Sequence, residues 1–237
     1  MPKALANPRL FDDLPVVFDD FAQLFGGALR DYLSARIPES AGRAVDLGCG
    51  TGLHAALLAP HFADILGVDV SAPMLEFART RRPHASVRYE QRDLRDVSVG
   101  LDGQFDLVFS AYTLHHVPDL PDALRQIREL VRPGGQLILI DNVDPRRQVP
   151  RAWFKAEARK GLMADLRHRR RSPSQAWRAY RRYTNRGLLD HFTTDVFLTP
   201  EEFEALYREV FPGVDIAPMY RARAVHWHAP GAQPHDA

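Results

Sequence analysis

The chain has 237 residues, of which 45% are hydrophobic and 26% charged, and its formal net charge is +1 at pH 7. This balance is typical of a globular domain and excludes disordered, collagen-like and membrane-embedded chains. The N-terminal residues lack a secretory signal pattern, no run of 18 apolar residues predicts a membrane span, and the single Cys49 excludes an internal disulfide. A cytoplasmic protein is therefore expected.

The first predicted element is a helix over residues 18–37, where apolar residues recur every three or four positions. Gly26 and Gly27 weaken it by about 1 kcal/mol each relative to alanine. From residue 43 to 141, short apolar runs alternate with helical patterns. The predicted strands cover 44–47, 65–69, 87–91, 105–110 and 136–141, and the predicted helices cover 53–60, 73–81 and 120–132. This alternation predicts a Rossmann-like, doubly wound α/β fold with helices on both faces of a mainly parallel sheet.

A basic segment interrupts the alternation after the fifth predicted strand. Residues 146–186 contain 14 Lys or Arg and two acidic residues, a net charge of +12. Amphipathic patterns predict that residues 144–198 form a helical cap over the carboxyl ends of the strands. The elements predicted from here on are helices over 150–170, 174–189 and 200–210 and strands over 214–219 and 222–228. The last two strands complete a seven-stranded sheet.

A glycine-rich loop follows the first predicted strand. Residues 45–52 read V-D-L-G-C-G-T-G, so a buried strand ends in glycines that let a ligand approach the backbone. A P-loop is excluded because no lysine follows Gly52, and the G-x-G-x-G spacing differs from the dinucleotide pattern. Asp46, two residues before the first glycine, favours a cationic ligand group over a pyrophosphate.

Two further carboxylates stand at the ends of the next two strands. Asp69, 17 residues after Gly52, is placed to accept hydrogen bonds from both ribose hydroxyls. Asp93 follows the third strand, where it can accept a hydrogen bond from an adenine amino group. The loop and the three acids predict one extended ligand that has an amino group, a ribose and an adenine, and that needs no phosphate.

These motifs together resemble the class I S-adenosylmethionine-dependent methyltransferases. The matching segments, in order, are V-D-L-G-C-G-T-G, G-V-D-V-S-x-x-M-L, R-D-L, F-D-L-V-F-S-A-Y-T-L-H-H-V and V-R-P-G-G-Q-L-I-L. The resemblance covers residues 43–141 densely and 199–228 loosely. It implies S-adenosyl-L-methionine as the cofactor. The cofactor-binding residues that it implies are Asp46, Gly48, Cys49, Gly50, Gly52, Asp69, Val70, Met74, Asp93, Leu94 and Ser110.

The chain is thereby divided into five parts. They are an N-terminal helical segment that closes over the cofactor (1–42), a cofactor-binding core (43–143), the basic helical cap (144–198), a C-terminal helix and hairpin that complete the core (199–229), and a disordered tail (230–237). A monomer or a homodimer is expected.

The segment 110–120, S-A-Y-T-L-H-H-V-P-D-L, places His115 and His116 just after the fourth strand. The resemblance implies that one of them acts as a general base, with Asp141 at the end of strand five as a second acid–base group. Alternatively, the pair only shapes the pocket beside the cofactor. No metal is predicted, because adjacent strand residues point to opposite faces and no cluster of third and fourth ligands is evident, with Asp119 and Asp141 the only acids expected nearby.

The cap carries aromatic residues that favour a small aromatic or heteroaromatic substrate, as in natural-product metabolism. The candidate substrate-binding residues are Phe18, Tyr112, Trp153, Trp177, Tyr180, Tyr183 and His191. Alternatively, these aromatics only dock the cap onto the core. The clustered arginines leave two other functions open: methylation of RNA, or a non-catalytic role as a cofactor-binding relative.

Overall fold

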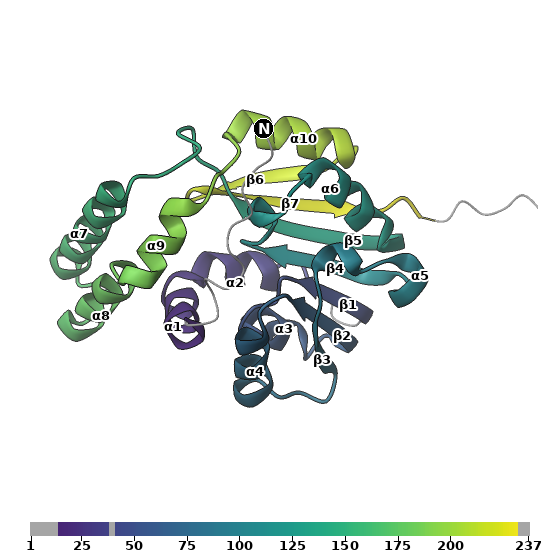
Figure 1. The fold of residues 1–237 in the computed structure, drawn as a ribbon, viewed down its shortest axis with the longest axis horizontal. Coiled ribbons are helices and arrows are strands. Elements are labelled where there is room, and N and C mark those ends of the chain that lie inside the picture. The colour runs from purple at the N-terminus through teal and green to yellow at the C-terminus, as the bar shows by residue number, and fades with distance from the viewer. Residues whose placement is uncertain (1–13, 38–40, 232–237) are drawn as a thin grey trace, which may run out of the picture.

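The computed structural model describes residues 14–37 and 41–231, and its centre is a seven-stranded sheet of order β3-β2-β1-β4-β5-β7-β6 (Figure 1). The strands are β1 (Ala41–Leu47), β2 (Phe62–Asp69), β3 (Val87–Gln91), β4 (Phe105–Ala111), β5 (Val131–Asn142), β6 (Asp215–Met219) and β7 (Ala222–His228). Strands β1 to β5 pair in parallel, whereas β7 runs antiparallel to both of its neighbours. The predicted mainly parallel α/β sheet is confirmed.

Helices cover both faces of this sheet. They are α1 (Pro15–Phe25), α2 (Gly27–Ser34), α3 (Leu53–Leu58), α4 (Ala72–Arg81), α5 (Val99–Asp102), α6 (Leu120–Glu129) and α10 (Pro200–Val210), with 3₁₀ turns η2 (Leu94–Asp96) and η3 (Leu114–His116). The hydroxyl of Thr199 and the carboxylate of Glu202 form the predicted capping box at the start of α10. Among the described residues, no helix is long and apolar enough to cross a membrane.

Two helix predictions are wrong at their ends. The predicted helix 18–37 is two helices, because the backbone leaves helical angles at Gly26 (ψ 11°), where a Cβ atom would lie 2.5 Å from the carbonyl oxygen of Ala22. The predicted helix 120–132 stops at Glu129, and the Pro-Gly-Gly sequence belongs to the beginning of β5, where the pairing with β4 shifts register.

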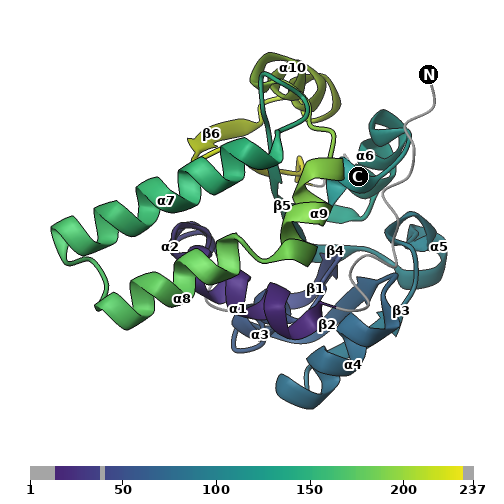
Figure 2. The ribbon, with the colours of Figure 1, turned by 60° about the vertical axis from the view of Figure 1, so that its left-hand side comes forward.

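Three helices are inserted between β5 and α10: α7 (Arg151–His168), α8 (Pro173–Tyr183) and α9 (Arg186–Thr194). Figure 2 shows α7 and α8 as a helical hairpin beyond the carboxyl ends of the parallel strands, with α9 leading back to the sheet. The prediction of one helix over 174–189 is wrong, because Asn185 caps a new helix by accepting a hydrogen bond from the Leu188 N–H. Apolar residues at three- and four-residue spacing predict a buried face on the first cap helix that includes Leu166. This residue is 43% exposed, so the buried face of α7 differs from the predicted one.

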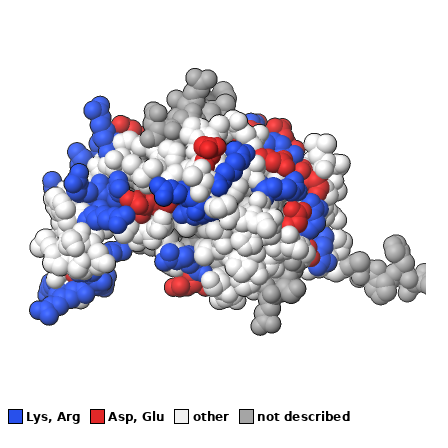
Figure 3. Space-filling model, turned by 90° about the horizontal axis from the view of Figure 1, so that it is seen from below, with Lys and Arg blue, Asp and Glu red and all other residues white. Residues whose placement is uncertain are grey.

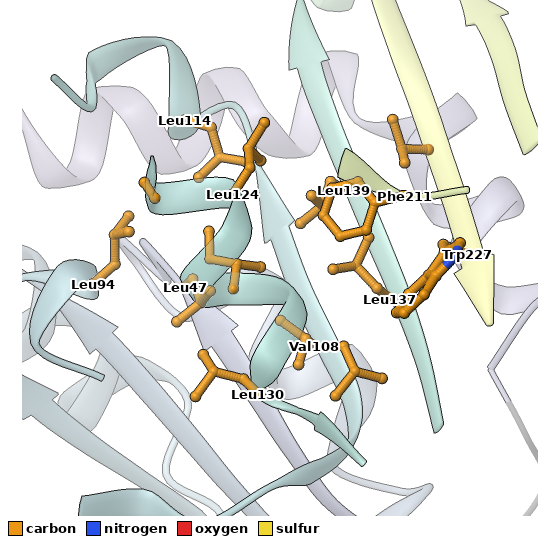
Figure 4. Close-up of a cluster of buried hydrophobic side chains, with 14 of the residues drawn as sticks. Leu47, Leu94, Val108, Leu114, Leu124, Leu130, Leu137, Leu139, Phe211 and Trp227 are labelled. Atoms are coloured by element: carbon orange, nitrogen blue, oxygen red, sulfur yellow. The ribbon is translucent and has the colours of Figure 1, made fainter. Parts of the chain in front are cut away.

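The core lies on both faces of the central strands. Along β5, Leu137 and Leu139 point to one cluster, and Ile138 and Ile140 point to the cluster on the opposite face. Figure 4 shows the first cluster, in which Phe211 and the β5 leucines pack against Trp227. Because both faces are covered, the strands are rigidly held, and their carboxyl ends form a fixed edge for the loops that follow.

Candidate functional site

The glycine loop between β1 and α3 leaves an open space above Gly50. All three glycines have positive φ, but a Cβ atom on Gly48 would lie 2.2 Å from Thr113, and one on Gly52 would lie 2.5 Å from the Tyr89 hydroxyl. These two glycines are required by packing within the domain. Gly50 differs, because no heavy atom of the described chain lies within 4 Å of its Cβ position. Its backbone is therefore open to a ligand.

Asp46 is a buried carboxylate beside this loop. It is 1% exposed, and neither of its oxygens has a hydrogen-bond partner within the described chain. Burial and the nearby charge of Asp69 raise the pKa of Asp46 to about 8, against the opposing effect of the Ala55 backbone. An unpaired carboxylate in this position is costly, and a cationic ligand group beside it would offset the cost. The geometry fits a ligand with an amino or sulfonium group.

Asp69 ties the glycine loop to the end of β2. Its Oδ2 accepts a hydrogen bond from the Gly50 N–H at 2.8 Å, and its Oδ1 accepts one from the Ser71 N–H at 2.9 Å. The Ser71 hydroxyl in turn caps α4. The carboxylate therefore stands between the open glycine and the start of a helix, where a ribose with two hydroxyl donors fits.

Several predicted cofactor contacts have other partners in the fold. The hydroxyl of Ser110 donates to the Leu47 carbonyl at 2.7 Å and is buried, so it joins β4 to β1 and does not face a ligand. The Asp93 carboxylate accepts hydrogen bonds from the side chain of Arg95, at 2.6 and 3.0 Å, and from its backbone. If an adenine amino group donates to Asp93, it would replace hydrogen bonds that the side chain of Arg95 now makes to this carboxylate.

The remaining predicted cofactor residues surround the loop. Met74 and Leu94 are buried, whereas Val70 is 44% exposed at the edge of the same region. Cys49 is buried between the loop and β2, and burial raises the pKa of its thiol well above the usual range. Cys49 is thus an inert apolar wall and not a nucleophile.

Helix α1 is clamped onto the glycine loop, a feature that sequence reasoning missed. The buried Asp19 accepts a hydrogen bond from the Thr51 hydroxyl at 2.9 Å and pairs with Arg82 at 2.6 Å. Arg82 also donates to the Thr51 carbonyl at 2.8 Å. Three elements that are far apart in the sequence therefore meet at the loop. The predicted closing of segment 1–42 over a ligand involves α1, while residues 1–13 and 38–40 lie outside the described chain.

The two adjacent histidines lie in η3, and their ring centroids are 3.9 Å apart. The expectation that they point to opposite faces is wrong, because the chain has left the strand before it reaches them. Asp141 holds His115 twice: Oδ2 accepts from the backbone N–H at 2.7 Å, and Oδ1 lies 2.5 Å from Nδ1. Burial alone would lower the pKa of His115, but Asp141 and Asp195 outweigh it and raise the pKa to about 9.

Helix α9 brings two more groups to the histidine pair. Its His191 lies with its ring centroid 5.2 Å from that of His116, and Asp195 follows directly after the helix. Both side chains are buried. His191 was predicted as a site residue, whereas Asp195 was missed. The i, i+4 spacing of His191 and Asp195 was the available signal, since it places both on one helical face.

Tyr183 of the cap packs into an aromatic contact with α1. Its ring lies 5.8 Å from Phe21 and 5.5 Å from Phe25, centroid to centroid, and burial raises its pKa to about 12. Beside it, Asp20 of α1 forms ion pairs with Arg178 at 3.0 Å and with Arg182 at 2.5 Å, both from α8. These contacts dock the cap on α1, which is the alternative left open for the cap aromatics.

The other candidate substrate residues fall in different environments. Trp177 is 53% exposed and stacks on Tyr180, so the packing does not enclose it in a pocket. Trp153 lies beneath the guanidinium of Arg221, 4.3 Å from the ring centroid. Tyr112 directly follows β4 with a φ of 56°, and burial raises its pKa to about 12. Phe18 is half-buried on α1.

Residues 45–139 match the family model of a methyltransferase domain. The part of the chain from β1 to β5 is therefore similar to known methyltransferase domains. An uncharacterized methyltransferase of Mycobacterium tuberculosis is 38% identical over 113 residues, or 48% of this chain and 57% of that protein. A trans-aconitate 2-methyltransferase of Deinococcus radiodurans is 40% identical over 126 residues, or 52% of this chain and 46% of that protein. The chain thus spans about half the length of these relatives.

The fold around the methyltransferase domain also has a solved counterpart. The structure of a complex of DhpI with SAH aligns with a TM-score of 0.65 at 21% identity and covers 97% of this chain and 98% of the other. This similarity extends the shared fold beyond residues 45–139 to the inserted helices and the C-terminal strands.

Proposed function

We propose that this chain transfers the methyl group of S-adenosylmethionine to a small-molecule acceptor. The observation that carries the proposal is the open space at Gly50, with the buried Asp46 and Asp69 beside it. Thr113 links this space to the histidines, because its hydroxyl donates to the Gly48 carbonyl at 3.3 Å, two residues before His115. A cofactor side and an acceptor side therefore adjoin at one edge of the sheet.

The domain's residues would hold the cofactor as follows. Asp46 binds the ammonium group, Asp69 accepts from the ribose hydroxyls, and the Gly50 backbone lies against the ligand. Val70, Met74 and Leu94 flank the adenine, whose amino group takes the place of Arg95 on Asp93. When bound, S-adenosylmethionine supplies a methyl group on a positively charged sulfur. The protein's contribution is position, which supplies roughly 7–11 kcal/mol in well-oriented reactions.

The acceptor's electron pair forms the new bond to the methyl carbon while the carbon–sulfur bond breaks, and a hydroxyl acceptor must also lose a proton. We assign this proton to His116. Its side chain is 18% exposed, whereas that of His115 is 6% exposed and is held through Nδ1 by Asp141. Asp141 is then a positioning residue for η3 and not a second base. A well-placed base contributes roughly 10²- to 10⁴-fold in rate.

We place the aromatic or heteroaromatic acceptor beside His116 and His191, and Tyr112, Phe18 and Trp153 stay candidate contacts for it. RNA is the weaker candidate for the acceptor. Figure 3 shows Lys and Arg gathered where α7 and α8 lie, but several of these side chains are already in ion pairs. The arginines of the basic segment that pair with acidic residues are Arg146, Arg147, Arg151, Arg171, Arg178, Arg182 and Arg186.

Incubation with tritiated S-adenosylmethionine tests the proposal. We expect label to enter a small-molecule extract and not total RNA, and we expect the cofactor and its demethylated product to raise the melting temperature of the protein. Label in RNA alone, with binding that weakens steeply with salt, would support the RNA alternative. Cofactor binding without transfer to either pool would indicate a non-catalytic relative, and absence of binding would refute the proposal.

Replacing His116 with alanine is expected to lower turnover by roughly 10²- to 10⁴-fold because the proton acceptor is lost. The dissociation constant for S-adenosylmethionine should stay unchanged, since the described contacts of His116 are with His115, His191 and Asp195. Single-turnover kinetics and calorimetry measure the two quantities. His168→Ala, which removes an exposed histidine of the cap, is the matched control and should retain full activity. Full activity in His116→Ala would leave the pair only a role in shaping the pocket.

A further inference from the structure

Three histidines converge on the carboxylate of Asp195. His115 Nε2 and His191 Nε2 each lie 3.8 Å from Oδ2, and His116 Nδ1 lies 3.7 Å from Oδ1. His115, His116 and Asp195 can each turn one ligand atom into a common space, with these atoms within 4.8 Å of one another. The histidines come from η3 and α9, so the cluster forms only where the inserted helices return to the sheet.

The separations within the cluster are those of ligands around an ion. Hydrogen bonds between nitrogen and oxygen span about 2.7–3.2 Å, shorter than the contacts to Asp195. Ligand atoms about 2.0–2.2 Å from a tetrahedral zinc ion are separated from each other by about 3.4 Å. The distances of 3.7–3.8 Å run to the two different oxygens of Asp195 and are a few tenths of an ångström wider than this value. The three candidate ligand atoms lie within 4.8 Å of one another, so the side chains must draw closer together to hold an ion.

Asp195 itself points to a cationic occupant. The residue is 3% exposed, and within residues 14–37 and 41–231 its Oδ1 has no hydrogen-bond partner. The residue also lies at the carboxyl end of α9, where the helix dipole disfavours a negative charge. A buried carboxylate in this position favours a positive charge close by, which either the imidazolium of His115 or a bound cation supplies.

Asp141 is not one of the proposed ligands, but it orients one of them, His115. It accepts from the Nδ1 side of His115 at 2.5 Å, and this contact directs Nε2 toward Asp195. Carboxylate–histidine pairs of this kind orient the histidine ligands of metal ions and raise their basicity. From these observations we propose that His115, His116 and Asp195 bind a divalent transition-metal ion, with His191 bordering the site.

Two imidazoles and one carboxylate favour zinc, iron, cobalt or manganese over magnesium, which prefers oxygen ligands. Such a set leaves coordination positions open for a further oxygen. The proposal that a metal ion binds here depends only on the positions of these side chains. Its use in catalysis rests on the proposed function: an ion that occupies the His116 lone pair would replace this residue in promoting proton loss from an acceptor hydroxyl.

Cobalt provides the test, because Co²⁺ bound to nitrogen and oxygen ligands absorbs visible light. The full chain is first freed of metal with a chelator and then titrated with Co²⁺ in the absence of S-adenosylmethionine. We expect about one Co²⁺ per chain, a visible absorption band that Zn²⁺ abolishes and Mg²⁺ does not, and a raised melting temperature.

The variants Asp195→Asn and His116→Ala should each weaken Co²⁺ binding at least tenfold. Each removes one ligand, and circular dichroism of the metal-free variants confirms folding. His168→Ala, outside the cluster, should bind as the wild type does. Absence of the band, or binding that persists in both cluster variants, would overturn the site. A chain that binds Co²⁺ but not S-adenosylmethionine would retain the metal site and refute the proposed function.

Discussion

Replacing Asp69 with alanine is expected to weaken S-adenosylmethionine binding by more than about tenfold, or about 1.4 kcal/mol. Two losses add in this variant. The ribose hydroxyls lose their acceptor, which is worth about 1–3 kcal/mol when the group is buried. The Gly50 N–H also loses the carboxylate that accepts from it at 2.8 Å, so the glycine loop is no longer fixed to β2. Isothermal titration calorimetry measures the change.

Asp64→Ala is the matched control for this variant. Asp64 lies on the same strand, toward its other end, and forms half-exposed ion pairs with Arg43 and Arg88. Such surface pairs contribute little to stability, so this variant should fold and bind the cofactor normally. Asp69→Asn separates the two losses further, because it keeps the shape and removes the charge. Wild-type affinity in Asp69→Ala would show that the ribose is held elsewhere.

The second large effect is a proton released when the cofactor binds. With its pKa raised to about 8, Asp46 is mostly protonated in the free protein at pH 7. A cationic group of the ligand favours the ionised carboxylate, so binding expels the proton. The association constant is therefore expected to rise with pH, by up to about tenfold per unit, until it levels off above pH 8.

Calorimetry at pH 7 in buffers of different ionisation enthalpy counts this proton. Asp46→Asn should release one proton fewer than the wild type and retains any titration that belongs to the ligand itself. The free protein provides an independent check. Because the folded pKa of Asp46 lies above the unfolded value, the free energy of unfolding should fall as pH rises from about 4 to about 8. Equal proton release in both proteins would mean that Asp46 does not meet the cation.

The order of elements was predictable because each strand and helix of the core carries a local signal. Apolar runs such as 105–110 and caps such as Thr199 with Glu202 mark their own positions. The helix ends that were predicted wrongly depend on contacts with other parts of the chain, which the local sequence does not reveal. The Pro-Gly-Gly sequence at 133–135 is typical of the end of a helix, yet it lies within β5, at the irregularity in the pairing of β5 with β4. Asn185 divides the second cap helix although the amphipathic pattern continues across it.

The site divides in the same way. Asp46, Gly50 and Asp69 were predictable because they follow fixed positions at strand ends. The contacts of Asp19 with the glycine loop and of Asp195 with His115 and His116 were not, because these partners come from a distant part of the chain, and no spacing in the sequence measures that distance. The argument against a metal site assumed extended backbone at His115 and His116, where the chain forms a 3₁₀ turn.

Two adjacent acids on α1 connect this helix to the glycine loop on one side and to the cap on the other. Asp19 holds the glycine loop through Thr51 and Arg82, and Asp20 holds the cap through arginines of α8. A ligand at the loop that favours one position of α1 must change the affinity for a second ligand beneath the cap. By reciprocity, the second ligand changes the affinity for the first by the same factor. Where both ligands favour one position of α1, coupling between cofactor and substrate would run through this one turn of helix.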